Sequence, residues 1–249
     1  MILLPTTVFA HRGASKYAPE NTLPAFELAY EMGAEGIETD VQLTKDNIPI
    51  LIHDENIKRT TNGIGYVKNF TFAELQTLDA GSWFSKKYAQ TKILSLERFL
   101  QWAKNKSLYL NIELKNNRID YNGLETIVYD LVKDYQLLDR TTLSTFNRES
   151  VKRMKLLSKT IGVAFLTSKR NKNLVNDAKI LGANAIHIKY RLLNRYLVDK
   201  AHQENMDIRV YTVNRFPSMY RCFKLNCDGI FTDVPDKAIH LKKEQGGLP

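Results

Sequence analysis

Short apolar stretches rich in Val and Ile alternate along this chain with longer segments whose apolar residues recur at helical spacing. The apolar stretches predict strands at 7–11, 36–42, 48–54, 108–115, 141–146, 161–166, 183–188, 207–213 and 228–233. The amphipathic segments predict helices at 21–33, 95–105, 121–136, 147–158, 171–182, 194–205, 215–225 and 235–243. The strand–helix alternation recurs about eight times, which predicts a parallel sheet.

The strands are almost continuously apolar, as expected of strands that are buried on both faces. With 249 residues, the chain matches the size of a (β/α)8 TIM barrel. We therefore predict the α/β class and a single barrel domain over residues 1–249. An open doubly wound sheet is the alternative, but no G-x-G-x-x-G follows the first strand.

Residues 54–94 interrupt the alternation with turn signals such as Asn62-Gly63 and only a short helical piece. A loop this long inside a compact domain is usually a functional lid or subdomain. We expect a small insertion, or cap, after the strand that ends at His53. Five of its aromatic side chains are expected to form the insertion's own small core rather than an apolar rim at the mouth. They are Phe70, Phe72, Trp83, Phe84 and Tyr88.

The charge balance is basic, with 36 Lys and Arg against 27 Asp and Glu and a net charge of +9. A basic balance favours anionic partners such as phosphorylated metabolites, anionic lipid surfaces or nucleic acid, although a basic solvated surface explains it about equally well. Nucleic acid is not expected, because no helix-turn-helix pattern or basic motif interleaved with aromatics is present.

No apolar stretch reaches the ~20 residues that span a bilayer, so integral membrane association is not expected. The N-terminal "MILLPTTVFA" lacks a basic region and is interrupted by Pro5, which argues against a signal peptide. Cys222 and Cys227 are too few for a disulfide framework, and no zinc-type cluster surrounds them. We expect a cytoplasmic protein.

Polar side chains gather where the predicted strands end, and in a barrel this edge carries the chemistry. They are His11 and Arg12, Glu38 and Asp40, His53 and Asp54, Asn111, Glu113 and Lys115, and Tyr211 and Asn214. Residues two apart on a strand share a face, so Glu38 and Asp40 point the same way. Converging carboxylates with Glu113 would need a cation, and oxygen ligands suit Mg²⁺ or Ca²⁺. Salt bridges to neighbouring helices are the alternative for one acidic pair alone.

His11 and His53 can act as a general acid–base pair, because the unperturbed pKa of histidine lies near 6.5. Arg12 and Lys115 can bind a phosphate. Together with a divalent cation, these groups fit phosphodiester chemistry. His187, late on a strand, could line the mouth or lie satisfied in the core. His202 and His240 are expected on helix surfaces.

The same residues lie within "HRGASKYAPENTLPAF", "GIETDVQLTKDNIPILIHDENIKRTTNG", "LNIELK", "VYTVN" and "DGIFTDVPD". These segments, in order from residue 9 to about residue 236, resemble the glycerophosphodiester phosphodiesterase family. The resemblance implies a TIM barrel with a small cap after His53. It also implies hydrolysis of glycerophosphodiesters to sn-glycerol 3-phosphate and an alcohol.

Carried over by position, the resemblance implies a role for each site residue. The metal ligands are Glu38, Asp40 and Glu113; the acid–base pair is His11 and His53; the phosphate contacts are Arg12 and Lys115; the pocket residues are Asn21 and Tyr211. Asn21 is expected to order the mouth near Arg12, and Glu20 to fix Arg12 or the first helix. Gly13 is expected to let the chain turn closely beneath a phosphate. Many relatives have Trp where this chain has Tyr211, which bears on specificity for the alcohol.

The mechanistic hypothesis uses His11 as base and His53 as acid. Attack by a neighbouring glycerol hydroxyl, giving a cyclic phosphate, and direct attack by water both stay open. Lysophospholipase D activity and a non-catalytic phosphate-binding role are the alternative functions. The sequence does not decide the head group, the choice between Mg²⁺ and Ca²⁺, or the oligomeric state.

Overall fold

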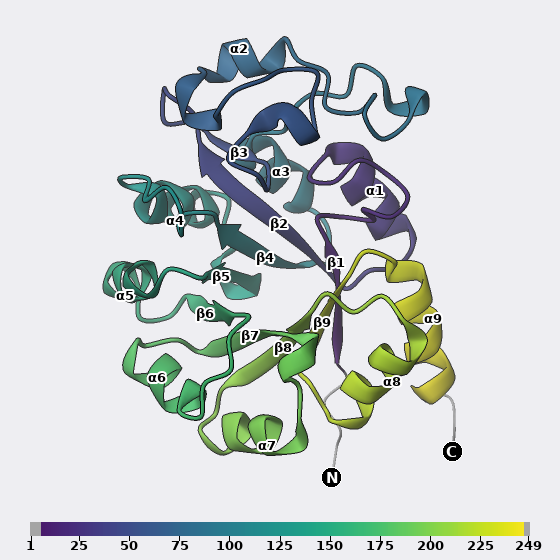
Figure 1. The fold of residues 1–249 in the computed structure, drawn as a ribbon, viewed down its shortest axis with the longest axis vertical. Coiled ribbons are helices and arrows are strands. Elements are labelled where there is room, and N and C mark those ends of the chain that lie inside the picture. Colours follow the sequence, from purple (N-terminus) through teal and green to yellow (C-terminus); the bar gives the residue numbers. More distant parts are fainter. Residues whose placement is uncertain (1–5, 247–249) are drawn as a thin grey trace.

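The computed structural model describes residues 6–246, which form a closed barrel of parallel strands (Figure 1). Its strands are β1 (Thr7–His11), β2 (Gly36–Leu43), β4 (Tyr109–Leu114), β5 (Thr141–Thr145), β6 (Gly162–Thr167), β7 (Ala185–Lys189), β8 (Asp207–Tyr211) and β9 (Gly229–Thr232). β1 pairs in parallel with both β2 and β9, and these pairings close the barrel. The prediction of a (β/α)8 barrel is therefore confirmed.

Helices surround the barrel (Figure 1). They are α1 (Leu23–Glu31), α3 (Leu96–Ala103), α4 (Leu124–Asp134), α5 (Arg148–Leu157), α6 (Leu174–Ile180), α7 (Arg195–Gln203), α8 (Phe216–Lys224) and α9 (Pro235–Gly246). In α3, Leu96, Phe99, Leu100 and Ala103 are buried at helical spacing. The side chain of Ser95 caps this helix by accepting from the backbone N–H of Arg98. Such one-sided burial explains why the amphipathic segments form the outer layer.

The segment predicted as a strand at 48–54 does not join the barrel. The strand there is β3 (Pro49–Leu51), and it pairs antiparallel with β2. Only a tight turn separates the two strands, with Asn47 at a φ of +59°. A connection so short can only fold back, because a parallel neighbour needs a long crossover. His53 therefore reaches the mouth from the return arm of a hairpin.

The insertion 54–94 contains η1 (Ile57–Arg59), η2 (Val67–Asn69), α2 (Phe72–Gln76) and η3 (Lys86–Tyr88), and it lies at the top of Figure 1. A second, smaller hydrophobic cluster belongs to it and to the hairpin. This cluster comprises Ile50, Ile52, Ile57, Val67, Leu75, Ala80 and Ile93. Phe70 and Phe72 pack against it, as expected.

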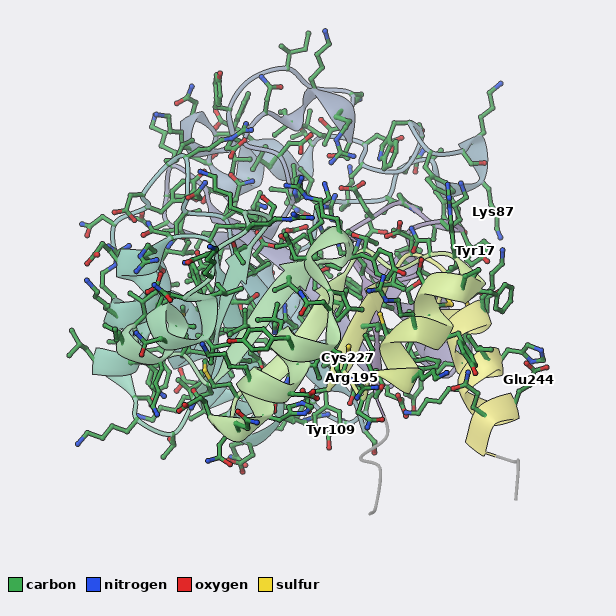
Figure 2. All side chains as sticks on the ribbon, turned by 60° about the horizontal axis from the view of Figure 1, so that its bottom comes forward. Tyr17, Lys87, Tyr109, Arg195, Cys227 and Glu244 are labelled. Carbon is green, nitrogen blue, oxygen red and sulfur yellow. The ribbon has the colours of Figure 1, made fainter. Side chains whose placement is uncertain are left out.

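The other three residues of that expectation, Trp83, Phe84 and Tyr88, do not join the cluster, so this part of the expectation is wrong. Trp83 and Phe84 meet edge to face, and Phe84 meets Tyr88 in the same way. The Tyr88 hydroxyl donates to the Tyr17 carbonyl at 3.0 Å. In Figure 2 the labelled side chains of Tyr17 and Lys87 lie near each other at one edge of the molecule. This aromatic group therefore fastens the insertion to the β1–α1 loop.

Candidate active site

A cavity of about 320 Å³ opens at the carboxyl ends of the barrel strands, where parallel barrels carry their sites. Its walls contain most of the residues predicted from the sequence. They are His11, Arg12, Glu38, His53, Glu113, Lys115 and Tyr211, joined by Asn111, Phe146, Leu166, His187, Lys189, Thr212 and Phe231. The strand-end rule, which selects polar residues at the ends of the predicted strands, thus identified side chains that are distant in the sequence and lie together in the fold.

Glu38, Asp40 and Glu113 form a buried acidic cluster on β2 and β4. Asp40 and Glu113 are register partners on these two neighbouring strands. One oxygen from each of the three carboxylates lies within 4.8 Å of the others. Burial and the charge of Asp40 raise the pKa of Glu38 to about 8. Without a bound cation, the charged form of Glu38 is therefore disfavoured even though Arg12 and Lys115 lie beside the cluster.

The cluster fits a hard divalent cation. Asp40 Oδ1 is buried and accepts no hydrogen bond from the described residues 6–246, although Lys115 Nζ lies 3.7 Å away. Burial raises the pKa of Asp40, but the charges of Arg12 and Lys115 outweigh it and hold the pKa below its usual range. Oxygen donors without sulfur or nitrogen suit Mg²⁺ and Ca²⁺. The unsatisfied oxygen of Asp40 and the mutual repulsion of the buried carboxylates are what a cation would relieve.

The loop after β1 wraps around this cluster. The backbone N–H of Arg12 donates to both the carbonyl and the Oε2 of Glu38, each at 2.9 Å. Arg12 and Gly13 have φ values of +58° and +82°. A Cβ on Gly13 would lie 2.7 Å from the carbonyl of Ala25 in α1. The packing of α1 therefore requires a glycine at this position, and the close approach of a phosphate to it stays a prediction.

Asn21 lies behind the cluster rather than in the cavity wall. Its Nδ2 donates to Asp40 Oδ2 at 3.0 Å, and its Oδ1 accepts from Thr39 Oγ1 at 2.7 Å. Its backbone N–H donates to the Arg12 carbonyl at 3.0 Å. The predicted ordering of the mouth near Arg12 agrees with these contacts, and the side chain orients a carboxylate.

Two cations flank the acidic cluster. Arg12 Nε lies 3.1 Å from Asp40 Oδ2, and Lys115 Nζ lies 2.7 Å from Glu113 Oε1. Burial lowers the pKa of Lys115, but the charges of Glu113 and Asp40 outweigh it and raise that pKa. Both side chains line the cavity as well. They can therefore contact a bound anion while they hold the carboxylates in place.

Each candidate histidine is oriented by a carboxylate on its Nδ1. His11 Nδ1 lies 2.7 Å from Asp233 Oδ1, and His53 Nδ1 lies 2.6 Å from Asp54 Oδ1. Because a carboxylate only accepts, each Nδ1 carries a hydrogen and each Nε2 is left to exchange a proton. Burial lowers the pKa of His11, but the charge of Glu38 and the Asp233 contact raise it overall.

A continuous chain of ion pairs joins Arg12 to His53 through the insertion. Arg12 Nη1 donates to Glu20 Oε1 at 2.9 Å. Arg59, in η1, donates to both Glu20 oxygens at 2.8 Å and to Asp54 Oδ2 at 2.5 Å. Asp54 in turn holds His53. Through the side chain of Arg59, the insertion thus orients both Arg12, a candidate for phosphate binding, and His53, a candidate for proton transfer.

Comparison with known proteins places this site in a family. The model of the glycerophosphoryl diester phosphodiesterase family matches residues 11–237. The glycerophosphodiester phosphodiesterase of Caldanaerobacter subterraneus is 37% identical over 98% of this chain and 100% of that protein. The one from Bacillus altitudinis is 38% identical over 96% and 99%.

A solved structure gives the same answer. The Oleispira antarctica phosphodiesterase, solved in complex with the product sn-glycerol-3-phosphate, superposes with a TM-score of 0.88. It is 29% identical and covers 96% of this chain and 97% of its own. The chain belongs to the glycerophosphoryl diester phosphodiesterase family. It is an enzyme, a phosphoric diester hydrolase.

Two residues that matter in this phosphodiesterase were missed from the sequence. Asp233 directly follows β9, so the strand-end rule could have found it in "DGIFTD". Asn214 donates to Asp233 Oδ2 at 2.5 Å and fixes it beneath His11. Arg59 gave no such signal, because its partners Glu20 and Asp54 are brought together only by the folded insertion.

Of the two alternatives for His187, the structure agrees with a position at the mouth, because this residue lines the cavity with its ring 5.0 Å from that of Phe231. A satisfied core histidine is wrong, because His187 is fully buried and neither ring nitrogen has a hydrogen-bond partner among residues 6–246. His202 contacts Asp228 at 2.9 Å on α7, and His240 contacts Glu244 at 3.1 Å on α9. None of the helices in residues 6–246 is both long and apolar enough to span a membrane.

Proposed function

We propose that this enzyme hydrolyses glycerophosphodiesters to sn-glycerol 3-phosphate and an alcohol, with a divalent cation and two-histidine acid–base catalysis. The observation that carries the proposal is the buried cluster of Glu38, Asp40 and Glu113, whose oxygens approach within 4.8 Å of one another. His11 lies beside it, with Nε2 4.0 Å from Glu38 Oε2. The product bound by the Oleispira relative supports the glycerol phosphate portion of the substrate.

In this proposal Glu38, Asp40 and Glu113 hold one Mg²⁺ or Ca²⁺ ion. When bound, the ion would neutralise phosphoryl charge and lower the pKa of a hydroxyl beside it. Arg12 and Lys115 bind the remaining phosphoryl oxygens, since both line the cavity next to the carboxylates. Tyr211 and Phe146, whose rings meet edge to face 6.2 Å apart, form the wall for the alcohol.

His11 is the base and His53 the acid. His11 stands next to the carboxylates, so it takes the proton from the attacking oxygen on the cation side of the phosphate. Asp233 stabilises the charge that His11 then carries. His53 gives its Nε2 proton to the leaving alcohol, and Asp54 fixes the ring that does so. A glycerol hydroxyl or a water molecule can supply the attacking oxygen.

Lysophospholipase D activity finds less support than glycerophosphodiester hydrolysis. An acyl chain needs an apolar rim, and the aromatic side chains of the insertion were its candidates. Within the described residues, none of Phe70, Phe72, Trp83, Phe84 and Tyr88 lines the cavity. Phe70 and Phe72 support the insertion's own core instead.

The test is a turnover panel over glycerophosphocholine, glycerophosphoethanolamine and glycerophosphoglycerol. Each substrate is assayed after chelation and then with Mg²⁺ or Ca²⁺ restored. We expect release of sn-glycerol 3-phosphate only with a cation present. Undiminished turnover in chelator would remove the cation from the proposal. Release of a phosphorylated head group would show that the enzyme cleaves the other phosphoester bond, on the glycerol side of the phosphorus.

A further inference from the structure

A second cavity, of about 790 Å³, lies on the same end of the barrel and has no role in the proposed reaction. Residues of the β6–α6 and β7–α7 loops and of the helices α6 and α7 form its walls. These two helices are neighbours in the outer layer of the barrel (Figure 1). The floor of the cavity is apolar, with Leu174, Val175 and Leu193 almost fully buried. The charged side chains that line the cavity, here called its rim, are all cations. They are Lys169, Arg170, Lys172, Arg191 and Lys200.

The cations of this rim are not neutralised from within the protein. None of them lies within 4.0 Å of a carboxylate in the part of the chain that the structure describes. The acidic side chains of α6 and α7 already have other partners. Asp177 pairs with Arg148 at 3.7 Å, Asp199 with Arg195 at 3.9 Å, and Glu204 with Lys179 at 2.5 Å. The rim therefore carries a net charge that only an anion from outside can neutralise.

The rim also continues toward the catalytic cavity. Lys189, the last residue of β7, is exposed and lines that cavity. Arg191 follows two residues later and lines the second cavity, where its Nη2 donates to the Ser168 carbonyl at 2.6 Å. Like the rim, Lys189 has no carboxylate within 4.0 Å among residues 6–246. Cations thus lead from the catalytic cavity to the second cavity.

We propose that the second cavity is a subsite for a second phosphate carried by the alcohol portion of the substrate. The preferred substrates are then glycerophosphodiesters whose alcohol is itself phosphorylated. The inference rests on the proposed function, because it needs the first phosphate in the catalytic cavity. A concave site of several hundred Å³ suits a small-molecule group, whereas a bilayer meets a flat or convex surface.

The experiment compares two substrates that differ by one phosphate, glycerophosphoinositol and its phosphate monoester. We expect the wild-type enzyme to favour the phosphorylated substrate in kcat/KM by about tenfold or more, since charge-assisted contacts are strong. This preference is expected to weaken as salt is added. The triple variant Lys169→Gln, Arg170→Gln, Lys172→Gln should lose most of it.

A matched control removes equal charge from the opposite end of the barrel. Lys104, Lys133 and Lys159 are exposed, follow or end helices, and have no ion-pair partner among the described residues. Their combined change to Gln should keep the substrate preference. Arg191→Gln, a single substitution in the other wall of the cavity, should by itself lower the preference for the phosphorylated substrate. Circular dichroism and thermal melting confirm that each variant is folded.

Several outcomes would overturn the inference. One is an unchanged ratio of the two kcat/KM values in the triple variant, and another is an equal loss on both substrates. A third is binding of phosphatidylglycerol vesicles by the wild type and not by the triple variant while the ratio stays constant, because the cations would then serve a membrane surface.

Calorimetry separates this inference from the proposed function. If neither substrate is hydrolysed with Mg²⁺ or Ca²⁺, the proposed function fails. The calorimetric affinities of the two ligands still test whether the subsite exists. Tighter binding of the phosphorylated ligand, lost in the triple variant, supports it. Equal binding of the two ligands overturns it.

Discussion

The two sides of the barrel mouth differ in whether their positively charged side chains are paired with carboxylates. On the side of β1, β2, β4 and the insertion, carboxylates hold the cations around the acidic cluster. Arg12, Arg59, Lys115 and Arg118 are held in this way. On the side of β6 and β7, the cations that line the two cavities have no such partners within the described residues. They are Lys169, Arg170, Lys172, Lys189, Arg191 and Lys200.

The difference separates two uses of a cation. A paired cation is fixed in position, and fixed groups are what a reaction at one phosphorus atom requires. An unpaired cation attracts anions from a distance and can be neutralised by a ligand. We call the side of β1, β2, β4 and the insertion the paired side, and the side of β6 and β7 the unpaired side. Substitutions on the paired side should therefore destroy catalysis, whereas substitutions on the unpaired side should alter substrate preference or stability.

The largest effect is expected from Glu113→Gln on the paired side. It removes one of the three carboxylates and the partner of Lys115. We expect kcat/KM to fall on the order of 1,000-fold, as when a main electrostatic contact of a reaction is lost. Steady-state kinetics with a cation present measure the loss. Glu149→Gln, which affects only the surface pair with Lys152, is the control. Near-normal turnover by Glu113→Gln would remove this residue from the ligand set.

His53→Ala should have a large effect that depends on the substrate. An acid matters most when the leaving oxygen is basic, so loss of the imidazole should slow alkyl esters by about 100-fold or more. A nitrophenyl ester of glycerol phosphate should lose far less, because its leaving oxygen needs no proton. Rates on the two ester classes are compared, and His240→Ala on α9 is the control. Equal losses on both classes would contradict the acid role.

Much of the paired side was readable from the sequence, because strand ends and i, i+2 spacing are local features. Glu38 and Asp40 share a face of β2, and their neighbour across the sheet supplies Glu113. The barrel was predictable for the same reason, since its strands are apolar and regularly spaced. The hairpin at β3 was not, because an apolar stretch does not reveal the direction of its partner.

The links between these residues were not readable, because they depend on side chains meeting across the fold. Arg59 contacts Glu20 across 39 positions of the sequence, and His11 contacts Asp233 across 222. No spacing rule joins such pairs. The basic rim was equally hidden, because net charge says how many cations there are but not which ones lack partners.

Arg59→Ala should show how much the links themselves contribute. Arg59 touches Glu20 and Asp54 and thereby positions Arg12 and His53. We expect kcat to fall about 10-fold to 100-fold with a smaller change in KM, as for other residues that orient catalytic groups. Arg59→Lys should restore part of the rate, because it keeps the charge but not the planar fork.

The neighbouring pair of Arg118 and Glu55 provides the matched control, since Arg118 is 78% exposed at the side chain and contacts Glu55 at 3.3 Å. Arg118→Ala should leave kcat within about twofold, as an exposed ion pair contributes little. Equal kcat values for Arg59→Ala and the wild type would show that the chain of ion pairs does not position the histidine.

The smallest effect is expected from Tyr211→Phe, at the end of β8. The Tyr211 hydroxyl is buried and has no hydrogen-bond partner among residues 6–246. Burial raises the pKa of this phenol, so it stays neutral and keeps its hydrogen. An unpaired buried hydroxyl costs about 1 kcal/mol or more, which the variant would recover. In a chain of this length the gain corresponds to a melting temperature higher by roughly 2–4 °C. Thermal melting of the free enzyme measures it. A lower melting temperature would mean that the hydroxyl has a partner, and the same comparison with substrate bound would show whether that partner is the alcohol.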